Sequence, residues 1–408
     1  MRGLDALGGY TSARLCALAT RRYSYGRSRS QVPGKPMTLS MRVPSIQSIR
    51  RLAAGGLIRG FVCGFVCGCL ALLAACGSSV TPDVAERAAA PVYNAQGCSA
   101  YGVRPRATVA ESLDGAINKV LMAIVESCRL HDGEVLTWTD ANATPRTACL
   151  IKAPQSSPTH PLPLLVYLPP TGIGPDALLI TGLVPQSKTA VLGANDAEPG
   201  FNILMPEGRD IEQFLPFPVN YGIGWDHWYR NFNRGSPYLN PDVAAIDHFI
   251  AATEAEGIVD TKRVYITGHS EGADMATLYG LNTPGIAATR VFSSISPFDD
   301  PADPCPQAAF ASNNTRPYFL TTRACDAGNA CVAGHQFLDQ LRAGVLPAAN
   351  VGGETLDVQG KVVEACDPTC EDPNPDTVTF IREQLNHVPW PVSRNPELLA
   401  YLRAHPLP

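Results

Sequence analysis

Short apolar runs alternate with stretches of helical periodicity over most of this chain. Runs rich in β-branched and aromatic residues between turn-forming residues predict strands, whereas apolar residues three or four positions apart predict helices. The predicted strands are 134–139, 148–153, 163–168, 201–205, 263–267, 291–296, 317–322 and 354–358, and the predicted helices are 112–130, 241–256, 271–279 and 336–342. The first two strands are expected to pair antiparallel. Strands that alternate with helices predict an α/β fold with a mostly parallel central sheet and helices on both faces.

One apolar run lies apart from this pattern, near the N-terminus. Three arginines precede the run of residues 61–75, which is too short to span a bilayer comfortably and is typical of an export signal. It ends in Leu73-Ala74-Ala75-Cys76, which resembles the bacterial lipobox, where the signal is cut before the cysteine and the thiol takes a diacylglycerol. An ordinary cleaved signal or an N-terminal membrane anchor is the alternative. The sequence thus predicts an exported protein of the bacterial cell envelope, lipid-anchored to the bilayer through Cys76 or secreted.

The export signal sets the expected domain organisation. Residues 1–75 form the signal region, and because its front is Arg- and Ser-rich without periodicity, Met41 would begin a signal of more usual length. Residues 76–97 are expected to be a lipidated tether. Residues 98–408 are expected to fold as one domain, since no repeat or linker interrupts them.

The charge of the chain is unevenly distributed. The whole chain carries 32 basic and 37 acidic residues, and residues 1–75 hold eleven of the basic ones but one acid, Asp5. The rest therefore has 21 basic against 36 acidic residues, a balance of -15. A surface this acidic repels phosphate backbones, so nucleic acid is not an expected partner.

The number of cysteines after residue 76 is consistent with export. Eight of them follow Cys76, namely Cys98, Cys128, Cys149, Cys305, Cys325, Cys331, Cys366 and Cys370. An even number in an oxidising compartment favours disulfides, and the pairs nearest in sequence, Cys325/Cys331 and Cys366/Cys370, are the expected local loops. A zinc site is the alternative, but neither a Cys-x-x-Cys motif nor a spaced His pair supports it, so no metal is expected.

The strongest chemical signal is a G-x-S-x-G turn between a strand and a helix. Gly268 and Gly272 lack the Cβ atoms that would clash where the strand turns sharply, which leaves Ser270 exposed at the apex. A helix N-terminus beneath the serine favours developing negative charge. The side chains of His269 and Glu271 flank the serine and are expected to point away from it, in structural roles. Ser270 is therefore the candidate nucleophile.

Three patches of the chain resemble one family. Asp260–Gly272 looks like the nucleophile segment of the polyhydroxybutyrate depolymerase and feruloyl esterase group of α/β hydrolases. Gly224–Arg230 is similar to that group's tryptophan-bearing segment, and Asn386–Pro391 resembles its histidine segment, usually Gly-His-x-Trp-Pro. The patches keep their order over residues 160–392. The resemblance implies the α/β-hydrolase fold for residues 98–408 and serine esterase activity.

The base and the acid should follow the serine, since chain order in this fold is serine, acid, histidine. His387 is the expected base, because it lies in a loop that Trp390 and neighbouring prolines can hold. His335 begins a predicted helix and leaves little room for an acid before it, and His405 lies near the terminus. The third residue, the acid, must be chosen among the aspartates that follow Ser270.

Asp326 is the expected acid, because it follows strand 317–322 directly, where the resemblance places it. Asp299 or Asp300, after strand 291–296, is the main competitor, and Asp339 lies inside a predicted helix. A carboxylate at this position would orient the imidazole and stabilise its charged form.

An oxyanion hole needs two N–H donors. One is expected from the backbone of Glu271, directly after the nucleophile, and the other from the loop after strand 163–168. This loop departs from the family's usual His-Gly, and Pro169 and Pro170 have no N–H to donate. Thr171 is therefore the expected second donor, and Gly172 is the next choice.

Aromatic residues near these segments could line a substrate pocket. The candidate substrate-binding residues are Trp225, Trp228 and Trp390. Trp225 and Trp228 form an aromatic cluster with Tyr221 and Tyr229, and this cluster could equally pack in the core or in a lid.

Together these features predict an exported serine carboxylesterase that forms an acyl-enzyme and needs no metal or organic cofactor. Polyester, feruloylated polysaccharide and small esters are all possible substrates, and the oligomeric state is left open. The alternatives are a peptidase of the prolyl-peptidase type, which shares fold and order of residues, and a lipoprotein that keeps the fold as a binding module.

Overall fold

The structure, a computed structural model, describes residues 105–108, 125–174, 177–212, 221–298, 316–327, 330–344, 346, 348–357, 359–370 and 385–408. All of them belong to one compact unit, Ala89–Pro408. The expected signal and tether, with Cys76, lie outside the described residues, as do Cys98, Cys305 and the competing acids Asp299 and Asp300.

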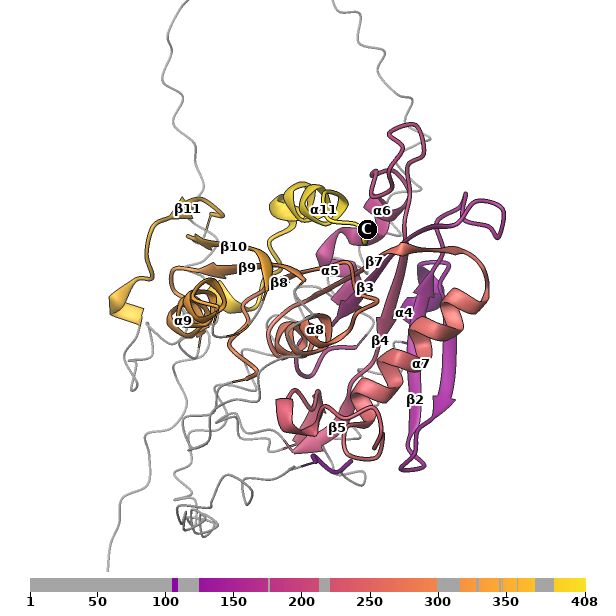
Figure 1. Cartoon of the computed structure of the whole chain (residues 1–408), viewed down its shortest axis with the longest axis horizontal. Coiled ribbons are helices and arrows are strands. Elements are labelled where there is room, and N and C mark those ends of the chain that lie inside the picture. Colours follow the sequence, from indigo (N-terminus) through magenta and orange to yellow (C-terminus); the bar gives the residue numbers. More distant parts are fainter. Residues whose placement is uncertain are drawn as a thin grey trace, which may run out of the picture. The chain divides into compact units, whose positions relative to one another are not determined.

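One large sheet organises this unit, with strand order β1-β2-β4-β3-β7-β8-β9-β10-β11 (Figure 1). The strands are β1 Glu134–Thr139, β2 Pro145–Ile151, β3 Leu162–Leu168, β4 Asn202–Pro206, β7 Val259–Gly268, β8 Ala288–Phe292, β9 Pro317–Arg323, β10 Ala349–Leu356 and β11 Val362–Val363. Neighbours from β4 through β10 pair in parallel, and antiparallel strands flank them at both edges. The predicted mostly parallel sheet and the antiparallel pairing of its first two strands are confirmed.

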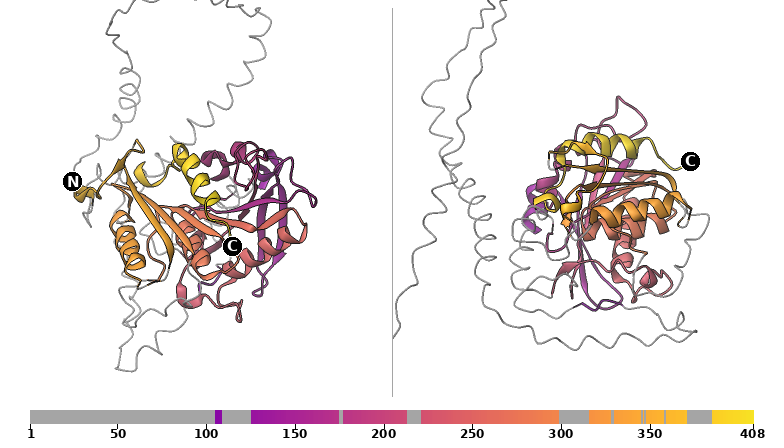
Figure 2. Two further views of the ribbon diagram at one scale, coloured as in Figure 1. Left: turned by 45° about the horizontal axis from the view of Figure 1, so that its top comes forward. Right: turned by 90° about the vertical axis from the view of Figure 1, so that its left-hand side faces the viewer.

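Helices cover both faces of the sheet (Figures 1 and 2). Their bounds are α4 Val125–Leu130, α5 Ala177–Thr181, α6 Leu183–Ser187, α7 Pro241–Ala255, α8 Glu271–Asn282, α9 Ala330–Arg342 and α11 Asn395–Arg403. Helices α7, α8 and α9 lie on one face, and α5, α6 and α11 lie on the other. Parallel sheets with both faces covered are typical of α/β proteins.

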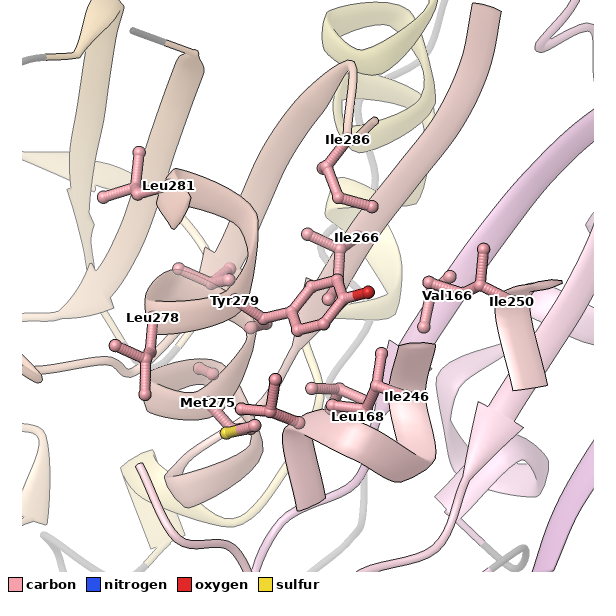
Figure 3. Packing of buried hydrophobic residues seen from close by; sticks show 14 of the residues in the cluster. Val166, Leu168, Ile246, Ile250, Ile266, Met275, Leu278, Tyr279, Leu281 and Ile286 are labelled. Atoms are coloured by element: carbon pink, nitrogen blue, oxygen red, sulfur yellow. The ribbon is translucent and has the colours of Figure 1, made fainter. Parts of the chain in front are cut away.

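Strand β3 shows why the sheet has two cores. Its residues are all buried, because successive side chains of a strand point to opposite faces. Val166 and Leu168 pack with Ile246 of α7 and Met275 of α8 in the first core (Figure 3). Tyr167 belongs to the second core, under α11. The continuous apolar run that predicts this strand is therefore a consequence of double-sided burial.

Helix α7 begins where the sequence predicts. The Asn240 side chain caps it by accepting a hydrogen bond from the Val243 N–H at 3.1 Å. The next acid, Asp242, is fully buried and binds the guanidinium groups of Arg146 at 2.7 Å and Arg209 at 2.9 Å. A buried carboxylate needs such partners, and the two arginines hold the N-terminus of α7 against β2 and β5.

Several elements differ from the prediction. Helices α5, α6 and α11 and strand β11 were not predicted, and β10 and α9 begin five or six residues earlier than expected. Strand β8 ends at Phe292 rather than at 296, because Ser293 adopts a φ of 59°, outside the strand region. An antiparallel hairpin of β5 Arg209–Glu212 and β6 Tyr221–Gly224 was not expected. Each strand has four residues, and β5 contains one apolar residue, Ile211, so it has no recognisable apolar pattern.

The expected local disulfides are wrong. The structure pairs Cys325 with Cys370 and Cys331 with Cys366, besides Cys128 with Cys149. The segment after β11 returns alongside the loop after β9, where the Asp367 N–H donates to the Ala324 carbonyl oxygen at 2.6 Å. Cys325 in this loop and Cys331 at the start of α9 therefore each meet a distant cysteine rather than each other.

Among the described residues, no helix has the length and apolarity needed to cross a membrane.

Candidate active site

The turn between β7 and α8 has the geometry of a nucleophile elbow. Ser270 has φ 55° and ψ −131°, a strained conformation for a residue other than glycine. A Cβ atom on Gly268 would lie 2.3 Å from the Gly272 carbonyl oxygen, and one on Gly272 would lie 2.3 Å from the Leu168 carbonyl oxygen. Both positions therefore require glycine, and the turn presents Ser270 beyond the end of the parallel strands.

Three side chains distant in sequence meet at this end of the sheet. The His387 Nε2 atom lies 2.7 Å from Ser270 Oγ, and its Nδ1 atom lies 2.6 Å from Asp326 Oδ1. Ser270 follows β7 and Asp326 follows β9, and carboxyl ends of parallel strands share one edge of the sheet. The structure thus forms a continuous hydrogen-bonded chain from hydroxyl to imidazole to carboxylate.

Asp326 is buried, with an exposed fraction of 3%. Its Oδ2 accepts a hydrogen bond from Ser293 Oγ at 2.7 Å. Burial alone would raise the pKa of this carboxyl, but the hydrogen bond and charge of His387, together with the Ser293 hydroxyl, outweigh it and lower the pKa. The left-handed turn at Ser293 therefore serves to hold the carboxylate ionised.

The contact with Asp326 that lowers the pKa of this carboxyl raises the pKa of His387. Burial lowers its pKa, but the hydrogen bond and charge of Asp326 outweigh burial, so the pKa lies above the ordinary value of 6.5. An ionised carboxylate only accepts hydrogen bonds, so Nδ1 must carry a proton. In the neutral imidazole, Nε2 is then free to accept the proton of the Ser270 hydroxyl.

Two neighbours fix the backbone that carries this imidazole. His269 Nε2 lies 2.8 Å from the His387 carbonyl oxygen, and since a carbonyl only accepts, His269 donates from Nε2. Burial and the nearby His387 lower the pKa of His269 to about 4, so it stays neutral. Arg323 donates to the adjacent carbonyl of Asn386. The structural role expected for the His269 side chain is confirmed.

Trp390 anchors the histidine segment in the core, which corrects its expected role in substrate binding. Its exposed fraction is 4%, and its ring packs against Phe292 and Tyr167 at centroid distances of 4.4 and 5.5 Å. Its indole N–H donates to Asn395 Oδ1 at 2.8 Å. The ring faces are covered by other side chains and the indole N–H is already hydrogen-bonded, so Trp390 presents no surface to a substrate.

Trp225 requires the same correction. It is fully buried, and its indole N–H donates to the Pro169 carbonyl oxygen at 2.9 Å, in the loop that follows β3. Trp228 is partly buried against the first core, with its ring 4.8 Å from that of Tyr229. A substrate contact by Trp228 stays a prediction.

The loop after β3 narrows the choice of a second oxyanion donor. The Gly172 N–H donates to the Ile223 carbonyl oxygen at 2.8 Å, and Pro169 and Pro170 have no N–H. Thr171 is left as the donor of this loop, and among the described residues its N–H has no backbone acceptor. Glu271 is the first residue of α8, where the N–H has no acceptor within the helix.

A buried carboxyl beside the elbow was not expected from the sequence. Asp274 Oδ1 accepts hydrogen bonds from the Ile295 N–H at 2.8 Å and from Ser294 Oγ at 2.9 Å. Burial raises the pKa of Asp274 to about 8. Its position four residues after Ser270, on the same helix face, is the one signal that could have indicated it.

The other candidate histidines are bonded elsewhere. His335 pairs through Nε2 with the Thr355 hydroxyl, and His405 through Nδ1 with the Tyr401 carbonyl oxygen. Asp339, the remaining alternative acid, is on α9 with a side chain 76% exposed.

No family model matches this chain, and no curated protein matches it. Solved structures with a similar fold include a thermostable esterase (16% identity, TM-score 0.42), which covers 67% of this chain and 63% of its own. An S-formylglutathione hydrolase from Agrobacterium tumefaciens (14%, 0.41) covers 67% and 95%, and an acylaminoacyl peptidase from Pyrococcus horikoshii (14%, 0.38) covers 67% and 42%. The chain therefore spans less than two thirds of the esterase and of the peptidase. Its strand order and serine turn are those of the α/β-hydrolase fold.

Proposed function

We propose that this protein is a serine carboxylesterase. The observation that carries the proposal is the hydrogen-bonded chain Ser270–His387–Asp326 at a glycine-flanked turn. We expect the N–H groups of Thr171 and Glu271 to complete this site as oxyanion donors. A serine hydroxyl is a weak nucleophile unless a base adjoins it and a third group orients that base. All of these requirements are met by described residues.

The first step acylates the serine. His387 Nε2 takes the Ser270 proton while Oγ bonds to the ester carbonyl carbon, and the carbonyl π electrons move to its oxygen. The N–H groups of Thr171 and Glu271 donate to this oxyanion. The oxyanion then reforms the carbonyl, the bond to the alcohol breaks, and the imidazolium gives its proton to the departing alkoxide. Asp326 stays ionised throughout and stabilises the imidazolium.

The second step releases the acid. Water replaces the alcohol, His387 takes a proton from it, and the hydroxide oxygen bonds to the acyl carbon. Collapse of the second oxyanion breaks the bond to Ser270 Oγ, which recovers its proton from His387. Esters fit this cycle because an alkoxide leaves more readily than an amide nitrogen.

A substrate comparison tests the reaction class. We expect purified exported protein to hydrolyse a short-chain p-nitrophenyl ester and to react covalently with a fluorophosphonate probe. Hydrolysis of an aminoacyl anilide at a higher kcat/KM than the ester would instead indicate a peptidase. Folded protein that neither labels nor turns over would point to a binding module that keeps the fold.

We further propose that the protein is exported and anchored in the cell envelope through a lipid on Cys76. The lipobox-like sequence supports this, and the three disulfides of the described residues suit an oxidising compartment. In a detergent phase-partition experiment on bacteria that express the full chain, wild type is expected in the detergent phase. The Cys76→Ala variant should lose lipid labelling and move to the aqueous phase, and equal partitioning of both would refute the anchor.

A further inference from the structure

We propose that the Glu271 side chain is a positioning residue for the oxyanion hole, which it controls through the Thr171 hydroxyl. This inference rests on the proposed esterase function and assigns a further role within the same site. It concerns the side chain of Glu271, whereas the proposed mechanism uses its backbone N–H.

The loop between Leu168 and Gly172 is held at its two ends by backbone atoms. The Trp225 indole N–H binds the Pro169 carbonyl oxygen at 2.9 Å, and the Gly172 N–H binds the Ile223 carbonyl oxygen at 2.8 Å. Thr171 lies between these anchors and carries the one N–H left in the loop for a substrate. Its hydroxyl makes a third attachment between these two anchors.

That side chain is bonded to the residue that follows the nucleophile. Thr171 Oγ1 donates to Glu271 Oε2 at 2.7 Å, a charge-assisted bond between the two residues proposed as oxyanion donors. Glu271 thus supplies one donor from its backbone and holds the other through its carboxylate. Glu271 therefore fixes the two N–H groups relative to each other. Because Ser270 directly precedes Glu271 in the chain, both groups are also fixed relative to the nucleophile.

The carboxylate is itself held from behind. Glu271 Oε1 accepts from Arg106 Nη1 at 2.8 Å, and the same Nη1 donates to the Trp225 carbonyl oxygen at 2.6 Å. The side chains of Arg106 and Glu271 are 11% and 9% exposed, so this ion pair is screened little by water. His227 Nδ1, a buried atom, lies 3.8 Å from Oε1. The carboxylate is therefore held between Arg106 and Thr171.

The result is a preorganised pair of donors. A donor that is fixed before the reaction stabilises the oxyanion without reorganisation, whereas a displaced donor loses that benefit. Removing the Thr171 hydroxyl should free the loop at its centre while it leaves the backbone N–H, the ion pair with Arg106 and the anchors at Pro169 and Gly172 in place.

The test compares Thr171→Val with Thr171→Ser on a p-nitrophenyl ester. Thr171→Val should lower kcat by about 10- to 100-fold with KM within twofold, since misplacement of a catalytic group by about 1 Å can cost 10²-fold. Affinity for a boronic acid, which forms a tetrahedral adduct with a serine, should fall by the same factor. Thr171→Ser keeps the hydroxyl and should retain at least half of the wild-type kcat. Thr189→Val, which removes an exposed hydroxyl bonded to the Pro185 carbonyl oxygen, is the matched control and should match wild type.

A double-mutant cycle with Glu271→Ala checks the partner. The double variant should be no slower than the slower single variant, because both changes break the same bond. Glu271→Ala removes the ion pair with Arg106 and can fail to fold, so Thr171→Val carries the test. A Thr171→Val enzyme with wild-type kcat and inhibitor affinity would overturn the inference while the esterase function stands. Inactive wild type that the fluorophosphonate does not label would overturn the proposed function itself.

Discussion

Replacing Ser270 with alanine is expected to lower kcat on a p-nitrophenyl ester by about 10⁶-fold. The reason is that no acyl-enzyme can form, so only the binding site and the oxyanion donors remain to assist direct attack by water. The Ser270 hydroxyl is hydrogen-bonded to His387, and it makes no capping hydrogen bond to helix α8. Its removal therefore takes no hydrogen bond away from the helix. The variant should therefore keep its melting temperature. Kinetics, fluorophosphonate labelling and thermal unfolding on the same preparation measure all three.

A second serine serves as the control for this change. Ser156 donates its hydroxyl to the Ile258 carbonyl oxygen at 3.2 Å, in a loop that supplies none of the proposed catalytic residues. Ser156→Ala should label fully and turn over as wild type does. If Ser270→Ala kept substantial activity, or if the probe were found on another serine, the assignment of the nucleophile would be wrong.

Replacing Asp326 with asparagine is expected to lower kcat on the order of 10⁴-fold. An amide in place of the carboxylate can donate a hydrogen bond to Nδ1, which favours the imidazole tautomer with its proton on Nε2, toward Ser270. Such an imidazole cannot accept the serine proton. Asp339→Asn, an exposed change on α9, is the matched control and should have wild-type kcat. A fully active Asp326→Asn enzyme would return the role of acid to Asp299 or Asp300.

The pH profile gives this variant a second measurement. The base must be neutral, so kcat/KM of wild type should fall as pH decreases through the pKa of His387, which lies above 6.5. The hydrogen bond and charge of Asp326 are the contacts that raise this pKa against burial. In Asp326→Asn the residual activity should therefore persist to lower pH than in wild type. A midpoint that did not move would show that Asp326 does not act on the base.

Much of the fold is encoded locally. Double-sided burial makes β3 a continuous apolar run, and the Asn240 side chain that caps α7 is recognisable from its sequence alone. The hairpin of β5 and β6 is different, because its strands are held by contacts with segments far along the chain, such as the Gly172 bond to Ile223. A short strand without its own periodicity leaves no local signal.

The candidate site divides in the same way. The elbow could be predicted because its constraint is steric and lies within five residues, from Gly268 to Gly272. The order of serine, acid and histidine along the chain indicated Asp326 and His387, but their contacts with Ser270 exist only because β7 and β9 end at one edge of the sheet.

The sequence by itself determined the α/β architecture, the serine turn and a short set of partners for it, since these depend on apolar periodicity and on backbone sterics. Tertiary structure alone decided the disulfide partners, the burial of Trp225 and Trp390, and the bond between Thr171 and Glu271. Each of these joins segments whose separation along the chain carries no information about their distance in space. That distance is set by strand order and by how the loops pack at the sheet edge.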